Sequence, residues 1–202
     1  MPLQNRVTPF GDIVALPGRG LLTGNRGVLH DDRKRIVRPW QSRRWIACEL
    51  EYKDIRRTLM TPHRWTELFF LDEAAAFAAA HRPCGECRRE EYRDFQRRFE
   101  AHHGVTAGAD AMDRVLHAER LNKRAKRTWR ADIATLPNAT YVAIDGEAYV
   151  VWNATLAKWS DSGYGAPSAM PAHRDVDVRT PPTMVAILRS GYRPRMHPTL
   201  FA

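Results

Sequence analysis

The sequence predicts an α+β fold, in which a small α/β module at the N-terminus packs with a helix and a β-rich C-terminal half. Short apolar runs alternate with helical segments in the first half of the chain and indicate the module. In the second half, two runs of strand-forming residues flank Asp145-Gly146, a pair that favours a two-residue hairpin turn. We expect a module over residues 1–104 and an α+β domain over residues 105–202, separate or joined in one compact unit.

Short strands are expected in the N-terminal module. Residues 1–28 are rich in Gly, Pro and Arg, which predicts loops and one short strand. The apolar run 68–71 predicts a buried strand, and residues 44–50 predict a strand that carries a cysteine.

Two helices should follow. Asp72 is expected to cap a helix that runs to about Ala80 and ends before Pro83. The next helix should begin at Cys87 or Arg88 and run to about His102, since its aromatic residues are spaced for one buried face.

The C-terminal half should contain a long basic helix over residues 110–127. The hairpin strands are expected at 139–144 and 147–152. Residues 160–173 are too polar and too rich in Gly and Pro for regular structure. A strand at Val176 and Val178 should precede a final helix, capped by Thr180, with Pro181 at its first position and Gly191 at its close.

The composition indicates a soluble, basic protein. Hydrophobic residues make up 44% of the chain and charged residues 27%, which is ordinary for a globular protein. No apolar run approaches the length that spans a bilayer, and the N-terminus lacks the pattern of a secretory signal. We therefore expect a cytoplasmic protein without a membrane partner.

The net charge of +9 arises mostly from arginine, whose planar fork matches the geometry of phosphate. Nucleic acid, DNA above all, is therefore the first partner to consider. The alternative is that a GC-rich genome has enriched the chain in Arg and Ala without any such partner.

Cys48, Cys84 and Cys87 are the three cysteines of the chain. An odd number of cysteines in a chain without a leader favours metal binding over a disulfide framework. The Cys84-x2-Cys87 spacing is that of a zinc knuckle, and Cys48 would supply a third ligand. Tetrahedral zinc needs a fourth ligand, for which His30, His63 and His81 are candidates. A redox pair is the alternative, but such a pair usually opens a helix after a strand, whereas a helix precedes this one.

The segments Phe69–Ala74 and Ala78–Cys87 resemble the second half of the Ada-like metal-binding domain superfamily, the zinc domain of a DNA-repair methyltransferase. Thr23–His30 is similar to the first half, and the resemblance covers about residues 20–100. It implies one structural zinc ion held by His30, Cys48, Cys84 and Cys87.

Two departures from the family pattern affect what the resemblance implies. The first two ligands are usually close together, whereas residues 31–47, a strongly basic insertion, separate His30 from Cys48. His30 would also replace the thiolate that accepts a methyl group in the family, and an imidazole cannot perform that chemistry. The resemblance therefore implies a structural site or a reader of the phosphate backbone.

Two basic segments are candidates for contact with nucleic acid. Both combine arginine with aromatic residues, which suits phosphate contact and base stacking. The candidate residues are Arg35, Arg38, Trp40, Arg43 and Arg44 in the first segment, and Arg124 and Arg127 in the second. Cations at a helix C-terminus also satisfy the helix dipole without a partner, so the second segment has a purely structural alternative.

Asp113, His117 and Arg120 would share one stripe of the long helix, where they could bind a phosphate or move a proton. A solvated helix face with local ion pairs is the alternative. The loop 160–173 is a second candidate because loops on a rigid sheet often carry function. No nucleotide-binding, hydrolase or metalloprotease motif is present.

Three hypotheses follow from the sequence. The first is a zinc protein that binds nucleic acid through an Arg-rich surface. The second is an enzyme that acts on nucleic acid or nucleotides, with its chemistry in the C-terminal half. The third is an interaction module without enzymatic activity.

Overall fold

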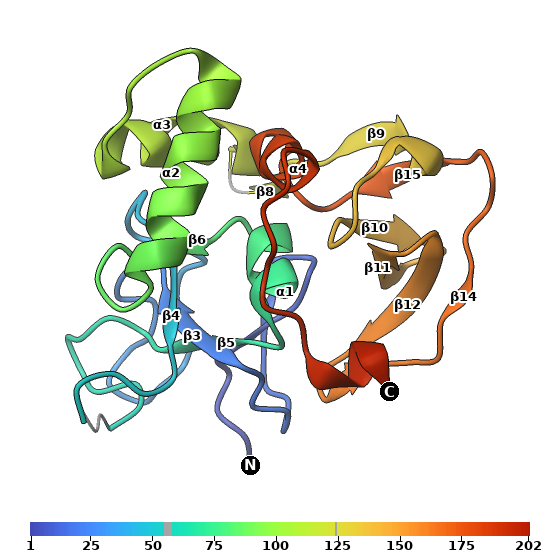
Figure 1. The fold of residues 1–202 in the computed structure, drawn as a ribbon. Coiled ribbons are helices and arrows are strands. Elements are labelled where there is room, and N and C mark those ends of the chain that lie inside the picture. The colour runs from blue at the N-terminus through green and yellow to red at the C-terminus, as the bar shows by residue number, and fades with distance from the viewer. Residues whose placement is uncertain (55–57, 124) are drawn as a thin grey trace.

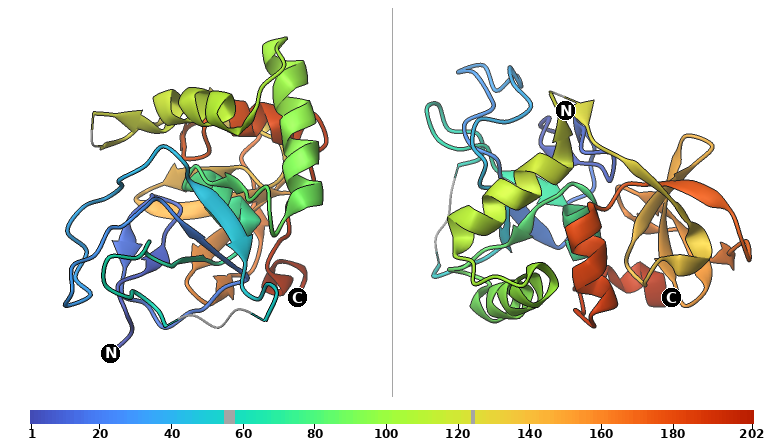
Figure 2. Two further views of the ribbon diagram at one scale, coloured as in Figure 1. Left: turned by 90° about the vertical axis from the view of Figure 1, so that its left-hand side faces the viewer. Right: turned by 90° about the horizontal axis from the view of Figure 1, so that it is seen from above.

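A computed structural model describes residues 1–54, 58–123 and 125–202. Two β-sheets lie on either side of the short helix α1 (Glu73–Ala78), as Figure 1 shows. Three further helices, α2 (Arg89–His103), α3 (Ala109–Arg120) and α4 (Pro182–Arg189), gather at one end of the molecule (Figures 1 and 2). The predicted α+β class and the β-rich C-terminal half are confirmed.

The N-terminal sheet has six short strands in the order β2-β1-β5-β3-β4-β6. Their bounds are β1 (Arg6–Val7), β2 (Ile13–Val14), β3 (Leu22–Asn25), β4 (Ile46–Glu49), β5 (Leu68–Phe70) and β6 (Arg82–Pro83). The predicted strands at 44–50 and 68–71 are confirmed, and residues 1–28 hold three strands where one was expected.

The two faces of this sheet differ in chemistry because side chains alternate along each strand. Val7, Leu22, Ala47, Leu68 and Phe70 pack with Ala76 and Ala79 in one apolar cluster, so this inner face turns toward α1. The residues between them in sequence point the other way. This outer face presents Arg6, Thr23, Asn25, Cys48 and Phe69.

Helix α1 begins as predicted. The Asp72 side chain accepts a hydrogen bond of 2.8 Å from the backbone N–H of Ala75, the usual capping contact. All six residues of the helix are buried, which explains the run of small alanines between two sheets. After Ala80, at φ 66°, the chain turns into β6, which pairs parallel with β4.

Helix α2 matches its predicted bounds, with Phe95 and Phe99 buried and Gly104 closing it at φ 65°. The prediction of one helix over residues 110–127 is wrong at its C-terminal end. Helix α3 stops at Arg120, and β7 (Leu121–Asn122) and β8 (Ala125–Lys126) follow as a small hairpin. The hairpin returns Lys126 to the protein, where its ammonium donates hydrogen bonds to the carbonyls of Pro9 and Ala78.

The C-terminal sheet has seven strands in the order β13-β12-β11-β10-β15-β9, with β14 also paired to β12. Their bounds are β9 (Trp129–Asp132), β10 (Tyr141–Ile144), β11 (Glu147–Trp152), β12 (Thr155–Ser160), β13 (Gly163–Tyr164), β14 (Ser168–Ala169) and β15 (Asp175–Val178). The predicted hairpin is confirmed, since Ile144 pairs with Glu147 and both Asp145 and Gly146 have positive φ. The stretch 160–173, expected to be irregular, contains β13 and β14.

The predicted cap of helix α4 is wrong by one residue. Pro181 is the N-cap and Pro182 is the first helical residue. The Thr180 hydroxyl instead accepts a hydrogen bond of 2.9 Å from the backbone N–H of Tyr141, which ties the helix to the sheet. Gly191 follows the C-cap at φ 101°, as expected. Single 3-10 turns occur at Ile133–Thr135 and Pro198–Phe201.

The largest hydrophobic core draws residues from both sides of the predicted boundary at 104/105. Phe77 and Phe95 of the N-terminal half pack with Tyr192, near the C-terminus. The Tyr192 hydroxyl donates to Glu73, and the Tyr164 hydroxyl donates to Asp72 at 2.6 Å. Within the described chain, no helix is long and apolar enough to cross a membrane.

Candidate metal centre

The three cysteines come together at one edge of the N-terminal sheet. Cys48 lies on β4, and Cys84 and Cys87 lie in the turn between β6 and α2. Their sulfur atoms all lie within 4.8 Å of one another. These three residues therefore could hold a metal ion.

Strand pairing explains why cysteines so distant in sequence meet. Strands β4 and β6 run parallel with Ala47 opposite Pro83, and a cysteine follows each of these two residues in the sequence. The backbone N–H of Cys84 donates to the carbonyl of Ala47 at 2.9 Å and fixes this register. The turn then closes through the Arg88 N–H, which donates to the Cys84 carbonyl at 3.2 Å.

Hydrogen bonds connect the three thiols to one another and to the backbone. The hydrogen bond between Cys48 and Cys84 raises the pKa of Cys48 and lowers the pKa of Cys84. The backbone N–H of Glu49 also donates to the Cys87 sulfur at 3.4 Å. Three thiolates so close together repel one another, and a divalent cation removes that repulsion and keeps all three ionised.

The donor set fits zinc. Zinc binds thiolate at about 2.3 Å in tetrahedral geometry, which places two sulfur ligands about 3.8 Å apart. Soft thiolates select zinc over magnesium or calcium, which prefer oxygen.

The structure does not bring the three candidate histidines to the thiols. His30 is buried, and its ring nitrogens lie 2.6 Å from the Thr66 hydroxyl and 3.2 Å from the Thr61 carbonyl. His63 is exposed near Asp32, and His81 packs against Trp45 and Phe70. Among the described residues, the group of metal-ligating side chains consists of the three cysteines alone. The ligand set implied by the family resemblance therefore lacks its fourth member here.

All three cysteines line a cavity of about 690 Å³ on the outer face of the N-terminal sheet, which we call the thiol cavity. Strand residues Arg6, Thr23, Asn25 and Phe69 form its floor. The walls are completed by residues that follow Cys48, by residues that precede β5 and by one residue of the cysteine turn, namely Glu49, Glu51, Tyr52, Trp65, Glu67 and Glu86. Glu67 is buried, and one of its carboxylate oxygens accepts a hydrogen bond of 2.8 Å from the Met60 N–H.

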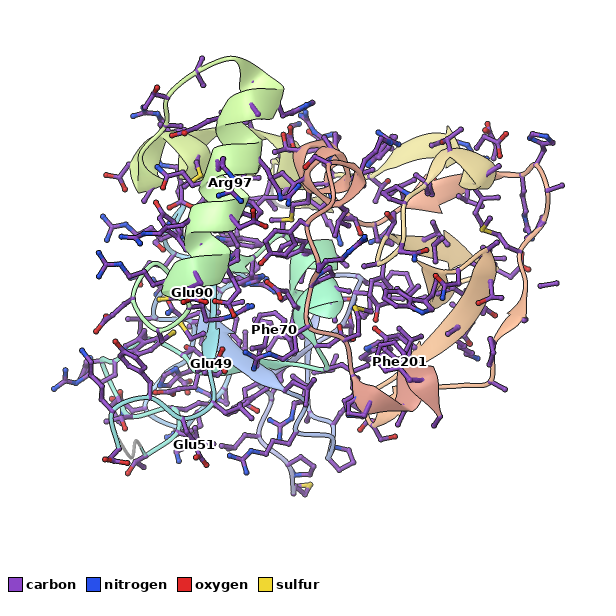
Figure 3. The ribbon with its side chains drawn as sticks, viewed as in Figure 1. Glu49, Glu51, Phe70, Glu90, Arg97 and Phe201 are labelled. Carbon is purple, nitrogen blue, oxygen red and sulfur yellow. The ribbon has the colours of Figure 1, made fainter. Side chains whose placement is uncertain are left out.

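Buried charges hold the turn in place. Arg88 follows Cys87, is fully buried and contacts the Glu73 carboxylate of α1 at 2.8 Å. Glu49, beside the N-terminal end of α2 in Figure 3, contacts Arg88 and accepts two hydrogen bonds from Arg195 of the C-terminal tail. The turn is thus anchored to α1 and to the tail.

The residues predicted to contact nucleic acid lie mostly on the surface. Arg35, Arg38, Arg43, Arg44 and Arg127 are exposed. Arg35 pairs with Asp31 at 2.6 Å and Arg44 with Asp110 at 3.5 Å. Trp40 is half-buried, with its ring edge-on to His117. Arg124 lies outside the described residues.

The structural alternative for Asp113, His117 and Arg120 is a solvated helix face with local ion pairs. The three side chains do not form such a face. Asp113 is buried and accepts two hydrogen bonds, of 2.9 and 2.7 Å, from Arg82. His117 packs near Trp40 and Trp45, and burial lowers its pKa. Arg120 is buried with its guanidinium over the Trp45 ring. Arg120 lines a second cavity, which is smaller than the thiol cavity.

The loop 160–173 serves the fold. Tyr164 is buried and hydrogen bonds to Asp72 and Tyr141. The Asp161 carboxylate accepts from the backbone N–H of Gly18 at 3.0 Å. The loop thus fastens the C-terminal sheet to the N-terminal segment.

Sequence reasoning missed several residues of the smaller cavity. Arg26, Lys126 and Arg179 line it together with Arg120. Arg26 and Lys126 lie inside segments noted for other reasons, and Arg179 gave no signal, because a single arginine between a strand and a helix is unremarkable.

Comparisons with models of protein families, with curated proteins and with solved structures find no match to this chain. The resemblance to the Ada-like domain therefore stays a prediction from the sequence.

Proposed function

We propose that the protein binds one zinc ion through the thiolates of Cys48, Cys84 and Cys87, with its fourth coordination position facing the thiol cavity. The observation that carries the proposal is the meeting of three sulfur atoms within 4.8 Å on the cavity wall. The residues outside the description are isoleucine and arginine, which donate no metal ligand.

The number of protein ligands decides the kind of site. Structural zinc sites have four protein ligands, whereas sites that bind a ligand or activate water have three and leave one position open. With three thiolates beside a cavity, this protein belongs to the second kind. The ion would also join β4 to the turn before α2, so it would stabilise the fold as well.

The cavity adds groups that a ligand of the zinc ion would meet. Bound zinc would act as a Lewis acid toward a ligand in that position. Glu67 supplies a buried carboxylate, and Arg6 supplies a cation whose guanidinium lies over the Phe69 ring. The extended form of the proposal is therefore an enzyme, in which the zinc ion would polarise a bound substrate, Glu67 would accept a proton and Arg6 would hold an anionic group of that substrate.

Metal analysis of the purified protein tests the proposal. We expect about one equivalent of zinc in the wild type and less than about a fifth of that in Cys84→Ser. Glu51→Gln, on the cavity wall but outside the sulfur group, is the matched control and should keep its zinc. Zinc-free wild type, or full zinc in Cys84→Ser, would refute the site.

Nucleic-acid binding remains a second candidate function. The two basic segments lie far apart in sequence, yet Trp40 of the first and Lys126 of the second line the same cavity. Their convergence favours one basic surface formed by Arg38, Arg43, Arg44 and Arg127. If it binds nucleic acid, log Kd should rise linearly with log salt. Phosphate contacts respond to salt between about 50 and 200 mM. If the affinity for duplex and single-stranded DNA stays constant over that range, this candidate function is ruled out.

A further inference from the structure

The smaller cavity has a volume of about 400 Å³ and lies by the inner face of the N-terminal sheet, away from the cysteines. Among the described residues, four basic side chains line it: Arg26, Arg120, Lys126 and Arg179. Asp12 is the one carboxylate among its lining residues. We call it the cationic cavity.

We propose that the cationic cavity binds the phosphate group of a phosphate monoester. The inference is independent of the zinc proposal, since no cysteine lines this cavity.

The burial of these charges is the first argument. Arg26 is 2% exposed and Arg120 is 1% exposed. Across residues 1–54, 58–123 and 125–202, no ion pair involves either arginine, Lys126 or Arg179. A buried charge without a counter-charge destabilises the folded protein, so an anion that enters the cavity would relieve that cost.

The hydrogen bonds of these cations go to neutral groups. Arg26 donates to the carbonyls of Gly11 and Pro39, and Arg120 donates to those of Leu116 and Arg43. Backbone carbonyls orient the guanidinium groups without neutralising them. The cations are thereby held in place for a ligand that brings the charge.

Donors also remain free for a ligand. Within the described part of the chain, the Arg120 Nη2 and the Arg179 Nε are buried and have no hydrogen-bond acceptor. Buried donors in native proteins are almost always satisfied, so two unpaired donors on residues that line one cavity point to an acceptor supplied by a ligand. A phosphate oxygen is such an acceptor, and guanidinium groups match phosphate geometry.

The electrostatics agree with this geometry. Burial lowers the pKa of Arg26 and of Arg120 to about 9 and holds the pKa of Lys126 well below its usual value. Arginine nevertheless keeps its proton at neutral pH, so the field in the cavity stays positive. With three arginines against one carboxylate, a dianion gains more than a carboxylate would.

The cavity is larger than a phosphate group alone, and aromatic side chains occupy part of its wall. The guanidinium groups of Arg26 and Arg120 both lie over the Trp45 ring, 4.4 and 4.6 Å from its centroid. Trp40 also lines the cavity and is half-buried. The substituent of the monoester would pack against Trp40. The phosphate could belong to a free mononucleotide or to the 5′ end of an oligonucleotide.

Calorimetric titration tests the inference. Inorganic phosphate and adenosine monophosphate are the ligands, and adenosine is the control without phosphate. Arg179→Gln is the main variant because this half-buried arginine donates to a single carbonyl, that of Phe10. Arg189→Gln is the matched control, since Arg189 also donates to one carbonyl, that of Thr135, but is exposed on α4 and does not line the cavity.

We expect the wild type and Arg189→Gln to bind adenosine monophosphate equally, and Arg179→Gln to bind it about 10- to 100-fold more weakly. Lys126→Met should show a loss of similar size. Competition by a 5′-phosphorylated oligonucleotide, but not by its 5′-hydroxyl form, would assign the site to a nucleic-acid end, and absence of competition would assign it to a free phosphate ester. Equal affinity in Arg179→Gln and Arg189→Gln, or no binding of phosphate and adenosine monophosphate to the wild type, would overturn the inference.

Discussion

The thiol cavity and the cationic cavity lie on opposite sides of the N-terminal sheet and would bind ligands of opposite charge. Strand β4 carries Cys48 on its outer face and follows directly from Trp45, which lines the cationic cavity. On one side three thiols need a cation to ionise together. On the other side four basic side chains, of which Arg26 and Arg120 are buried, face one carboxylate, that of Asp12. The difference teaches that a charge imbalance inside a fold indicates the kind of ligand, even where no motif does.

Removal of the metal should lower the stability of the folded protein more than any other change. The ion would bridge β4 and the turn before α2, and thiolate zinc sites contribute many kcal/mol to folding. We expect a chelator to lower the unfolding temperature of the wild type by about 10 °C or more, measured by calorimetry. At about tenfold excess over Kd, phosphate should raise the same temperature by only a few degrees, because mass action then gives roughly 1.4 kcal/mol. Equal and small shifts of the unfolding temperature by the metal and by phosphate would contradict this difference between the two cavities.

The second-largest loss of stability is expected when the buried ion pair between Arg82 and Asp113 is broken. Arg82 lies two residues before Cys84, and its partner Asp113 lies on α3, which carries Arg120. Both side chains are buried, at 4% and 3% exposure. Arg82→Ala leaves the Asp113 charge unpaired, so chemical denaturation should show a loss of about 3–5 kcal/mol.

The double variant Arg82→Met with Asp113→Leu is the control for this pair. Because it removes both charges, it should lose less stability than either single change. Additive losses would show that the two side chains act independently.

Asp72 shows what an unpaired buried charge does when it can titrate. Burial raises its pKa to about 6, although three hydrogen bonds to its carboxylate oppose the shift. The folded protein therefore binds a proton more tightly than the unfolded chain between about pH 4 and pH 6. Stability should fall across that window as the pH rises, by at most roughly 3 kcal/mol.

Asp72→Asn removes this titration and gives the reference. Unfolding free energies measured from pH 4 to pH 7 should decline in the wild type relative to the variant. Parallel curves for the two proteins would contradict the raised pKa.

The smallest effect is expected for a charge that water already compensates. Arg97 pairs with Asp94 on the surface of α2, and its side chain is 73% exposed. Arg97→Ala should change the free energy of unfolding by less than about 1 kcal/mol. A loss near that of Arg82→Ala would mean that burial does not set the cost of these charges.

The sequence was informative wherever a local pattern determined the structure. The Asp72 cap, helix α2, the Asp145-Gly146 hairpin and the cysteine knuckle all follow from neighbouring residues. The end of α3 did not, because Lys126 leaves the helical pattern to reach carbonyls of Pro9 and Ala78, distant in sequence. The roles of His30 and Arg179 were hidden for the same reason, since their partners are set by tertiary packing.

The open coordination position is the central claim, and the absorption spectrum of the cobalt-substituted protein tests it most directly. Cobalt(II) in a tetrahedral thiolate site gives intense visible bands that respond to every ligand. With three cysteine ligands and one open position, the bands should shift when azide or imidazole is added at neutral pH. The same spectrum should be absent in Cys48→Ser. A tetrahedral spectrum that does not respond to added ligands would mean a closed four-ligand site and would contradict the account.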